Sequence, residues 1–212
     1  MSARGGISVS ALALLGSIAP SLGGVPDAMN AAFSETEQAA LARGEVIAKA
    51  TSVPSAGLVR AFDVRAAIQV RARPEEVFAI MTNCATAAQW VPHLHRCQVI
   101  DKAADRSWEL IEHEVDYSWL LPRFRYRFRA DYVANRRIRF RNAGGDLRDN
   151  DGLWILEPVD NGRRTNVLYQ VRLGPRIYIP GWLYRQSLLH ELPDLLRAIR
   201  VRATATGDAP RG

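Results

Sequence analysis

The chain has 212 residues, enough for one domain of ordinary size and an additional segment. Hydrophobic residues make up 48% and charged residues 24%, which is typical of a soluble globular protein, and the net charge of +6 permits attraction to anionic surfaces without indicating a fold. The sequence contains no nucleophile elbow, P-loop or dinucleotide fingerprint, which excludes the enzyme classes that those motifs mark.

The first 23 residues have the pattern of a signal peptide. Arg4 precedes an apolar stretch, Ile7–Leu22, and small residues at positions 21 and 23 suit the two key positions before a cleavage point. The stretch is short for a membrane span. We therefore expect the protein to be exported, to the periplasm. The alternative is that translation starts at Met29, which predicts a cytoplasmic protein.

Residues 24–61 are expected to form an N-terminal extension with a short helix. Ser34 and Glu37 make a capping box, which predicts that this helix begins at Ser34. The residues before Ser34 are expected to be a flexible tail, and residues 46–51 a short strand. Turn-forming residues at 54–57 then separate the extension from the main domain.

The main domain, residues 62–203, begins with a predicted strand at 64–72 and a helix that starts at Pro74. A second short helical piece is expected at 85–90. Short apolar runs with turn signals follow, including a turn at 144–146, and they predict an antiparallel meander. Its strands are expected at Cys97–Asp101, Trp108–Asp116, Phe124–Val133, Arg137–Asn142, Leu153–Pro158 and Asn166–Leu173.

The last element is a long amphipathic helix, Gly181–Val201, which Pro193 is expected to kink or split. A large sheet buries its apolar face against another element, and this helix is the only predicted one long enough to cover it. We therefore predict an α+β protein in which a curved antiparallel sheet of about six to seven strands wraps around the C-terminal helix. Residues 204–212 are expected to be a disordered tail.

Residues 62–203 resemble the START-like, or SRPBCC, superfamily, in the branch of polyketide cyclase-like and coenzyme Q-binding proteins. The resemblance is carried by Ala67-Ile-Gln-Val-Arg-Ala-Arg-Pro-Glu-Glu-Val-Phe-Ala-Ile-Met81, by Gln89-Trp-Val-Pro92, and by the meander with its final helix. It implies the helix-grip fold and a hydrophobic molecule held between sheet and helix, in many members without any chemistry. No cofactor is expected. The apparent export signal departs from the quinone-binding relatives.

The inward face of the sheet is the candidate ligand site. Residues 123–129 read Arg-Phe-Arg-Tyr-Arg-Phe-Arg, and this alternation places aromatic side chains on one face of a strand and arginines on the other. The aromatic residues either fill a sealed core or line a cavity, and the family resemblance favours the cavity. The predicted ligand-binding residues are Tyr126, Phe128, Phe140, Trp154, Tyr169, Trp182 and Leu189.

Two apolar connections, 117–122 and 175–182, are predicted to surround the mouth of this cavity. They either form a packed lid or contact an anionic membrane surface transiently while a ligand enters. The mouth residues are Trp119, Leu120, Leu121, Arg123, Arg176 and Tyr178.

The arginines of the outer face have two interpretations. Glu112, Glu114 and Asp116 on the preceding strand favour a cross-strand ladder of ion pairs. The alternative is an anionic partner such as lipid headgroups, while nucleic acid is not expected.

Cys84 and Cys97 are predicted to form a disulfide, because export places an even cysteine pair in an oxidising compartment. Ordinary buried thiols are the alternative in the cytosol. His93 and His95 complete a spacing that could bind metal with these cysteines, but a disulfide consumes both sulfurs, so no metal is predicted.

No residue is predicted to be catalytic. Acid–base candidates are present but none has a clear partner; they are Glu109, Glu112, His113, Glu114, Asp116, Asp131 and His190. The sequence therefore favours non-catalytic binding or transfer of a hydrophobic small molecule or lipid in the cell envelope. The alternatives are a cyclase- or hydrolase-like enzyme, a cytosolic quinone- or ribosome-associated module, and a sealed domain without a ligand.

Overall fold

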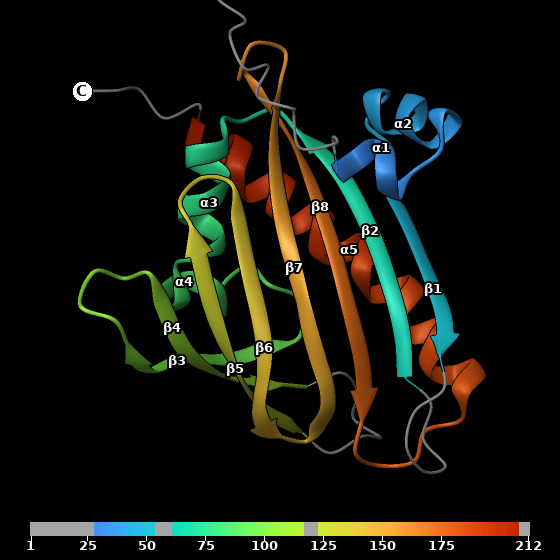
Figure 1. The fold of residues 1–212 in the computed structure, drawn as a ribbon, viewed down its shortest axis with the longest axis vertical. Helices are drawn as coiled ribbons and strands as arrows, with labels where there is room; N and C mark the ends of the chain where they lie inside the picture. The colour runs from blue at the N-terminus through green and yellow to red at the C-terminus, as the bar shows by residue number, and fades with distance from the viewer. Residues whose placement is uncertain (1–27, 54–60, 117–122, 208–212) are drawn as a thin grey trace, which may run out of the picture.

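The computed structural model describes residues 28–53, 61–116 and 123–207. Within them, a single antiparallel sheet of eight strands has the order β1-β2-β8-β7-β6-β5-β4-β3 (Figure 1). The strands are β1 (Ile47–Val53), β2 (Ala61–Val70), β3 (Leu94–Lys102), β4 (Trp108–Val115), β5 (Phe124–Val133), β6 (Arg137–Gly145), β7 (Leu147–Val159) and β8 (Arg164–Pro175). This is the predicted helix-grip fold, with a slightly larger sheet than expected.

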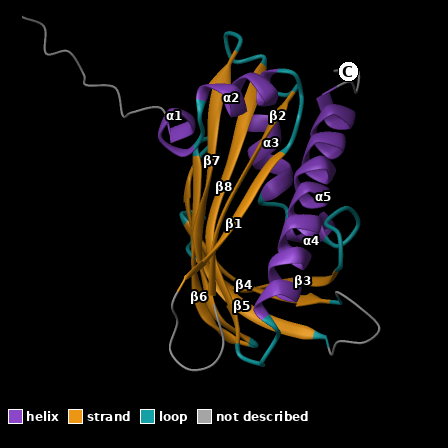
Figure 2. Cartoon of the chain, turned by 90° about the vertical axis from the view of Figure 1, so that its right-hand side faces the viewer, coloured by secondary structure: helices purple, strands orange, loops and turns teal. Residues whose placement is uncertain are grey.

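Helices lie on both faces of this sheet. They are α1 (Ala28–Ala32), α2 (Glu35–Ala42), α3 (Pro74–Met81), α4 (Cys84–Ala87) and α5 (Gly181–Gly207). Figure 2 shows α5 running along one face of the sheet, with α1 on the other side. None of the helices in the described segments is long and apolar enough to cross a membrane.

The main core lies between α5 and the strands β2 and β8. Ile68 and Val167 face the helix from neighbouring strands and have no exposed surface. On α5, Leu188, Leu192 and Leu196 recur every fourth residue, so one stripe of the helix faces the sheet. The alternating strands and the helical stripe therefore meet as the amphipathic patterns predict.

The N-terminal extension belongs to the sheet, which is why the strand count exceeds the prediction. β1 pairs along its whole length with β2, from Ile47 opposite Ala67 to Val53 opposite Ala61. The expected flexible tail before Ser34 is wrong for residues 28–32, which form α1.

The side chains of the extension explain why α1 is ordered. Met29, Phe33 and Leu41 are buried against Ala67 and Leu168, which point outward from β2 and β8. The extension thus covers apolar surface on the outer face of the sheet.

The chain reverses at the predicted turn, with Asp146 between the end of β6 at Gly145 and the start of β7 at Leu147, although Gly144 and Gly145 still belong to β6. Gly145 pairs with Tyr126 next to a register shift and has a φ of +96°. A Cβ at this position would overlap the carbonyl oxygen of Arg125. Gly145 therefore permits close pairing with β5.

Helix α5 is continuous from Gly181 to Gly207 and contains Pro193, so the proline does not split it. The helix also extends beyond the predicted end at Val201, because Ala203 is completely buried. Residues 204–207 of the expected disordered tail are thus helical, and the remainder of that tail lies outside the described residues.

Candidate functional site

A cavity of about 280 Å³ lies between the concave face of the sheet and α5. Its volume is near the lower end of the range of about 300–1,000 Å³ that is typical of small-molecule sites. Strands β3 to β8 supply most of its wall, and α3, α4, α5 and the loops beside these helices supply the rest. The apolar lining residues from the helices and adjoining loops include Met81, Ala87, Val91, Ile179, Leu188, Leu192, Leu195 and Ile199.

Aromatic rings cover much of the sheet side of the cavity. The Trp154 and Tyr169 rings are stacked with their centroids 4.0 Å apart, and Phe128 meets Phe140 edge to face at 6.1 Å. These residues come from β5, β6, β7 and β8, where the period-2 alternation turns each ring inward. The wall suits the apolar faces of a ligand.

His113 on β4 is the central polar group of this wall. Its Nδ1 lies 3.3 Å from the hydroxyl oxygen of Tyr126, and its ring meets Phe128 edge to face with centroids 4.9 Å apart. Burial lowers the pKa of His113 to about 4, because the charged imidazolium is poorly solvated in this position. His113 is therefore a neutral imidazole at neutral pH.

The Tyr132 hydroxyl on β5 and the Glu109 carboxylate on β4 form a second polar group. The Tyr132 hydroxyl donates a hydrogen bond of 3.0 Å to Glu109, whose side chain is almost completely buried. Burial, with the Glu109 carboxylate beside it, raises the pKa of Tyr132. Arg106 approaches the same carboxylate at 3.5 Å from the solvent side.

Glu191 on α5 is the single acidic side chain among the described residues that line the cavity. Its Oε2 lies 2.8 Å from Nε2 of His93. Nδ1 of His93 lies 3.2 Å from the carbonyl oxygen of Asp116, and His93 itself has a φ of 60°. The His93 ring thus joins the loop before β3 to the end of β4 and to α5.

The predicted disulfide between Cys84 and Cys97 is present, with the two Cα atoms 5.4 Å apart. It joins α4 to β3, and both residues line the cavity. Within the described segments, no group of three or more His, Cys, Asp or Glu side chains is suited to hold a metal ion. His95, from the same His-x-His-x-Cys spacing, is exposed on β3.

The structure brings together most of the predicted ligand-binding residues. Tyr126, Phe128, Phe140, Trp154 and Tyr169 all line the cavity. Leu189 packs against the core without lining the cavity, and Trp182 is 71% exposed. Both lie on α5 outside the stripe that faces the sheet.

The predicted mouth residues are only partly described. Trp119, Leu120 and Leu121 lie outside the described residues. Tyr178 is 68% exposed, and Arg176 donates a hydrogen bond of 2.6 Å to the carbonyl oxygen of Gly145.

Sequence reasoning missed several lining residues. Asn150 continues the inward series of β7 two residues before Gly152, so the alternation would have identified it. Trp90 lies in the Gln89–Pro92 motif, and its indole Nε1 is buried without a hydrogen-bond partner among the described residues. Tyr184 and Ser187 are polar residues on the inner stripe of α5, and an apolar periodicity does not identify polar positions.

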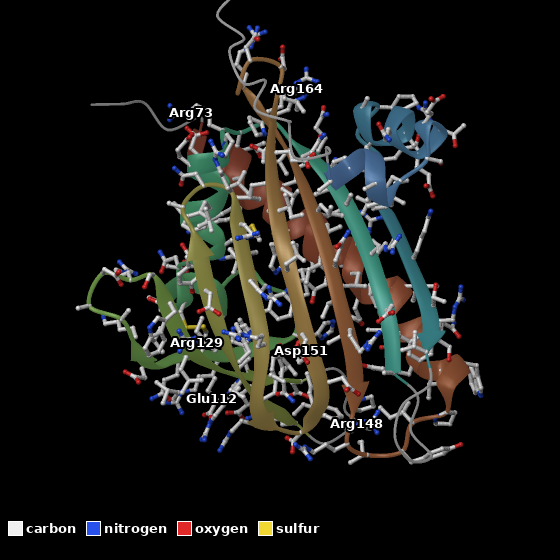
Figure 3. The ribbon with its side chains drawn as sticks, viewed as in Figure 1. Arg73, Glu112, Arg129, Arg148, Asp151 and Arg164 are labelled. Atoms are coloured by element: carbon white, nitrogen blue, oxygen red, sulfur yellow. A yellow bond between two sulfur atoms is a disulfide. The ribbon has the colours of Figure 1, made fainter. Side chains whose placement is uncertain are left out.

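The outer arginines form the predicted ladder with the acidic residues of β4. Arg123 and Arg125 reach Glu114 at 3.2 and 3.5 Å, and the hydrogen bond from Arg123 lowers the pKa of Glu114. Arg127 bonds Glu112 at 2.7 Å, and Arg129 lies over the Trp108 ring at 4.2 Å. Figure 3 labels Glu112 and Arg129 on this part of the sheet.

Solved structures share this fold. An aromatase/cyclase, Zhui from Streptomyces sp. R1128, has a TM-score of 0.61 at 15% identity, over 70% of this chain and 97% of that one. A STAR-related lipid transfer protein fragment from Xanthomonas axonopodis has a TM-score of 0.58 at 17% identity, over 73% and 98%. Human StAR-related lipid transfer protein 5 has a TM-score of 0.60 at 10% identity, over 82% and 94%.

Comparison with curated proteins gives no significant match. The family described as polyketide cyclase / dehydrase and lipid transport matches residues 70–200, from the end of β2 to the last turns of α5. This range contains the aromatic wall, the disulfide and most of the helix that covers the cavity. The chain therefore belongs to the polyketide cyclase / dehydrase and lipid transport family.

Proposed function

We propose that the protein binds a hydrophobic small molecule or lipid in the cavity beneath α5 and transfers it without chemical change. The observation that carries this proposal is the cavity of about 280 Å³, whose wall is mainly aromatic and aliphatic. A close-packed interior leaves few voids larger than a water molecule, so a cavity of this size is a functional feature rather than ordinary packing. The family, which includes lipid transport in its description, supports the same class of function.

An exposed apolar patch supports transfer at a membrane surface. Ile177, Tyr178, Trp182 and Leu183 are between 41% and 71% exposed, and they flank Ile179, which lines the cavity. Burying such a side chain contributes roughly 1.5–3 kcal/mol, which suits transient docking. Arg176 beside the patch would contact anionic headgroups.

The proposed location is the cell envelope. The signal-like pattern of the first 23 residues supports export, and the disulfide suits an oxidising compartment. Fractionation of the host, with blotting of the periplasmic and cytoplasmic fractions, tests this location. Accumulation in the cytoplasm would contradict it.

The binding function is tested on protein purified from its own host. Native mass spectrometry should show a bound species that solvent extraction releases as an apolar molecule. If no such species is present and uncharged fluorescent probes do not bind, the cavity does not serve as a ligand site.

The docking function is tested with vesicles that contain anionic lipids. Trp182→Ser should reduce both vesicle binding and the rate of probe transfer. Val201→Ser is the matched control, because Val201 is 68% exposed on the same helix but far along it from the patch. Equal behaviour of the two variants would contradict docking through the patch.

A cyclase-like enzyme is the second candidate function. The observation that favours it is His113, a neutral imidazole that faces the cavity beside a tyrosine hydroxyl, the type of group that serves as a general base. The fold similarity to an aromatase/cyclase is consistent with it. A measurable turnover that His113→Ala abolishes would establish the enzyme and exclude the non-catalytic carrier.

A further inference from the structure

The cavity has no cationic side chain in its described lining. The chain has 28 Lys and Arg residues, yet none of the described residues that line the cavity is a Lys or Arg. The alternation of the strands is the cause, because it directs the β5 and β6 arginines to the outer face. The sheet therefore separates a strongly charged surface from an uncharged wall.

The carboxylates on the inner side strengthen this contrast. Glu191 lines the cavity and is bonded to His93, while Glu109 is buried beside Tyr132. A ligand carboxylate or phosphate in the cavity would lie near Glu191, with no Lys or Arg in the described lining to pair with it. Burial of an unpaired anion is strongly unfavourable.

The His113–Tyr126 pair offers the cavity an uncharged polar contact. Nδ1 of His113 faces the Tyr126 hydroxyl, and Nε2 has no hydrogen-bond partner among the described residues. A neutral imidazole has one donor and one acceptor nitrogen, so Nε2 either donates or accepts, according to the tautomer. A hydroxyl group suits both tautomers, and a carbonyl or amide oxygen suits the donor form.

We propose that the cavity selects uncharged ligands, apolar molecules that carry a hydroxyl, carbonyl or amide group, with His113 as their polar contact, and that it rejects carboxylates and phosphates. This inference rests on the proposed binding function and specifies its ligand class. It also assigns His113 a role in recognition.

The test compares three ligands of equal chain length in competition with the uncharged fluorescent probe N-phenyl-1-naphthylamine. The ligands are dodecanol, methyl dodecanoate and dodecanoate, at about pH 8, where a carboxylic acid is ionised. Dodecanol and the ester should displace the probe at concentrations at least about tenfold lower than dodecanoate, because only the anion loses its hydration without gaining a cation.

Substitutions at His113 and at Glu191 test whether the selectivity arises within the cavity. His113→Leu should weaken dodecanol binding by about five- to tenfold, the usual effect of one lost hydrogen bond, and leave dodecanoate nearly unchanged. His95→Leu is the control, since His95 is exposed on the outside. If His113→Leu does not fold, Tyr126→Phe tests the same pair with a smaller change.

Glu191→Gln removes the negative charge from the cavity wall and should reduce the ratio of the dodecanol affinity to the dodecanoate affinity. Glu114→Gln, on the outer ladder, is its control and should leave the preference unchanged. Dodecanoate binding as tightly as dodecanol to the wild type would overturn the inference while leaving the proposed function intact. Failure of the probe and all three ligands to bind would overturn the proposed function itself.

Discussion

Trp154→Ala distinguishes a ligand cavity from a sealed core. Trp154 borders the cavity and stacks on Tyr169 with ring centroids 4.0 Å apart. Its removal enlarges an existing void rather than opening a new one, so the main loss is the stacking contact and part of the buried area. We expect destabilisation of about 1–2 kcal/mol, below the 3–5 kcal/mol that is usual for a large aromatic in a filled core.

Leu196→Ala is the matched control, because Leu196 lies on α5 with no exposed surface and packs in the main core. It should cost about 3 kcal/mol, within the usual range of 2–5 kcal/mol for such truncations. Urea melts of both variants give the two stabilities, and titration with N-phenyl-1-naphthylamine gives the two affinities.

The effects of the two variants on probe affinity should rank in the opposite order to their effects on stability. Trp154→Ala should weaken probe binding about tenfold, equivalent to about 1.4 kcal/mol, whereas Leu196→Ala should leave the affinity of the folded protein almost unchanged. A loss of 3–5 kcal/mol in Trp154→Ala, with no probe binding to the wild type, would refute the cavity interpretation.

Other residues give independent tests. Reduction should add the mass of two hydrogen atoms to the protein, and Cys84→Ser with Cys97→Ser should cost about 3 kcal/mol in urea melts, because the disulfide closes a short loop. Since the pKa of His113 is about 4 in the folded protein and about 6.5 when unfolded, the unfolded state binds the proton first, and stability should fall between about pH 6.5 and 4. That fall should be smaller in His113→Gln, and equal slopes would contradict the burial of a neutral imidazole. Trp90→Phe should change the unfolding free energy by less than about 1 kcal/mol, because it removes a buried donor that has no acceptor within the described segments; a larger loss would indicate a partner for that N–H.

Local periodicity predicted the site residues correctly wherever the direction of a side chain follows from its position in a strand. The alternation at 123–129 placed Tyr126 and Phe128 inward correctly, and the same rule applies to Trp154 and Tyr169. The six predicted meander strands each overlap a strand of the structure, because short turns fix neighbouring antiparallel strands.

The same reasoning fails where the direction depends on tertiary packing. Trp182 is strongly apolar, but it lies off the inner stripe of α5, and the helix phase is set by contacts distant in sequence. The order of α1 comes from outward apolar residues such as Leu168 on β8, which a simple alternation assigns to solvent. Gly145 ends β6 at the predicted turn, but its close approach to β5 is a contact between residues distant in sequence, which the turn signal does not reveal.

The same residues of α5 hold the core together and cover the cavity. Leu188, Leu192 and Ile199 pack in the main core and also line the cavity. Beside them, Oε2 of Glu191 lies 2.8 Å from Nε2 of His93 and connects the helix to the loop before β3. A movement of α5 away from the sheet would therefore widen the cavity and expose core residues in a single step. Access to the cavity beneath this helix is thus coupled to the stability of the domain.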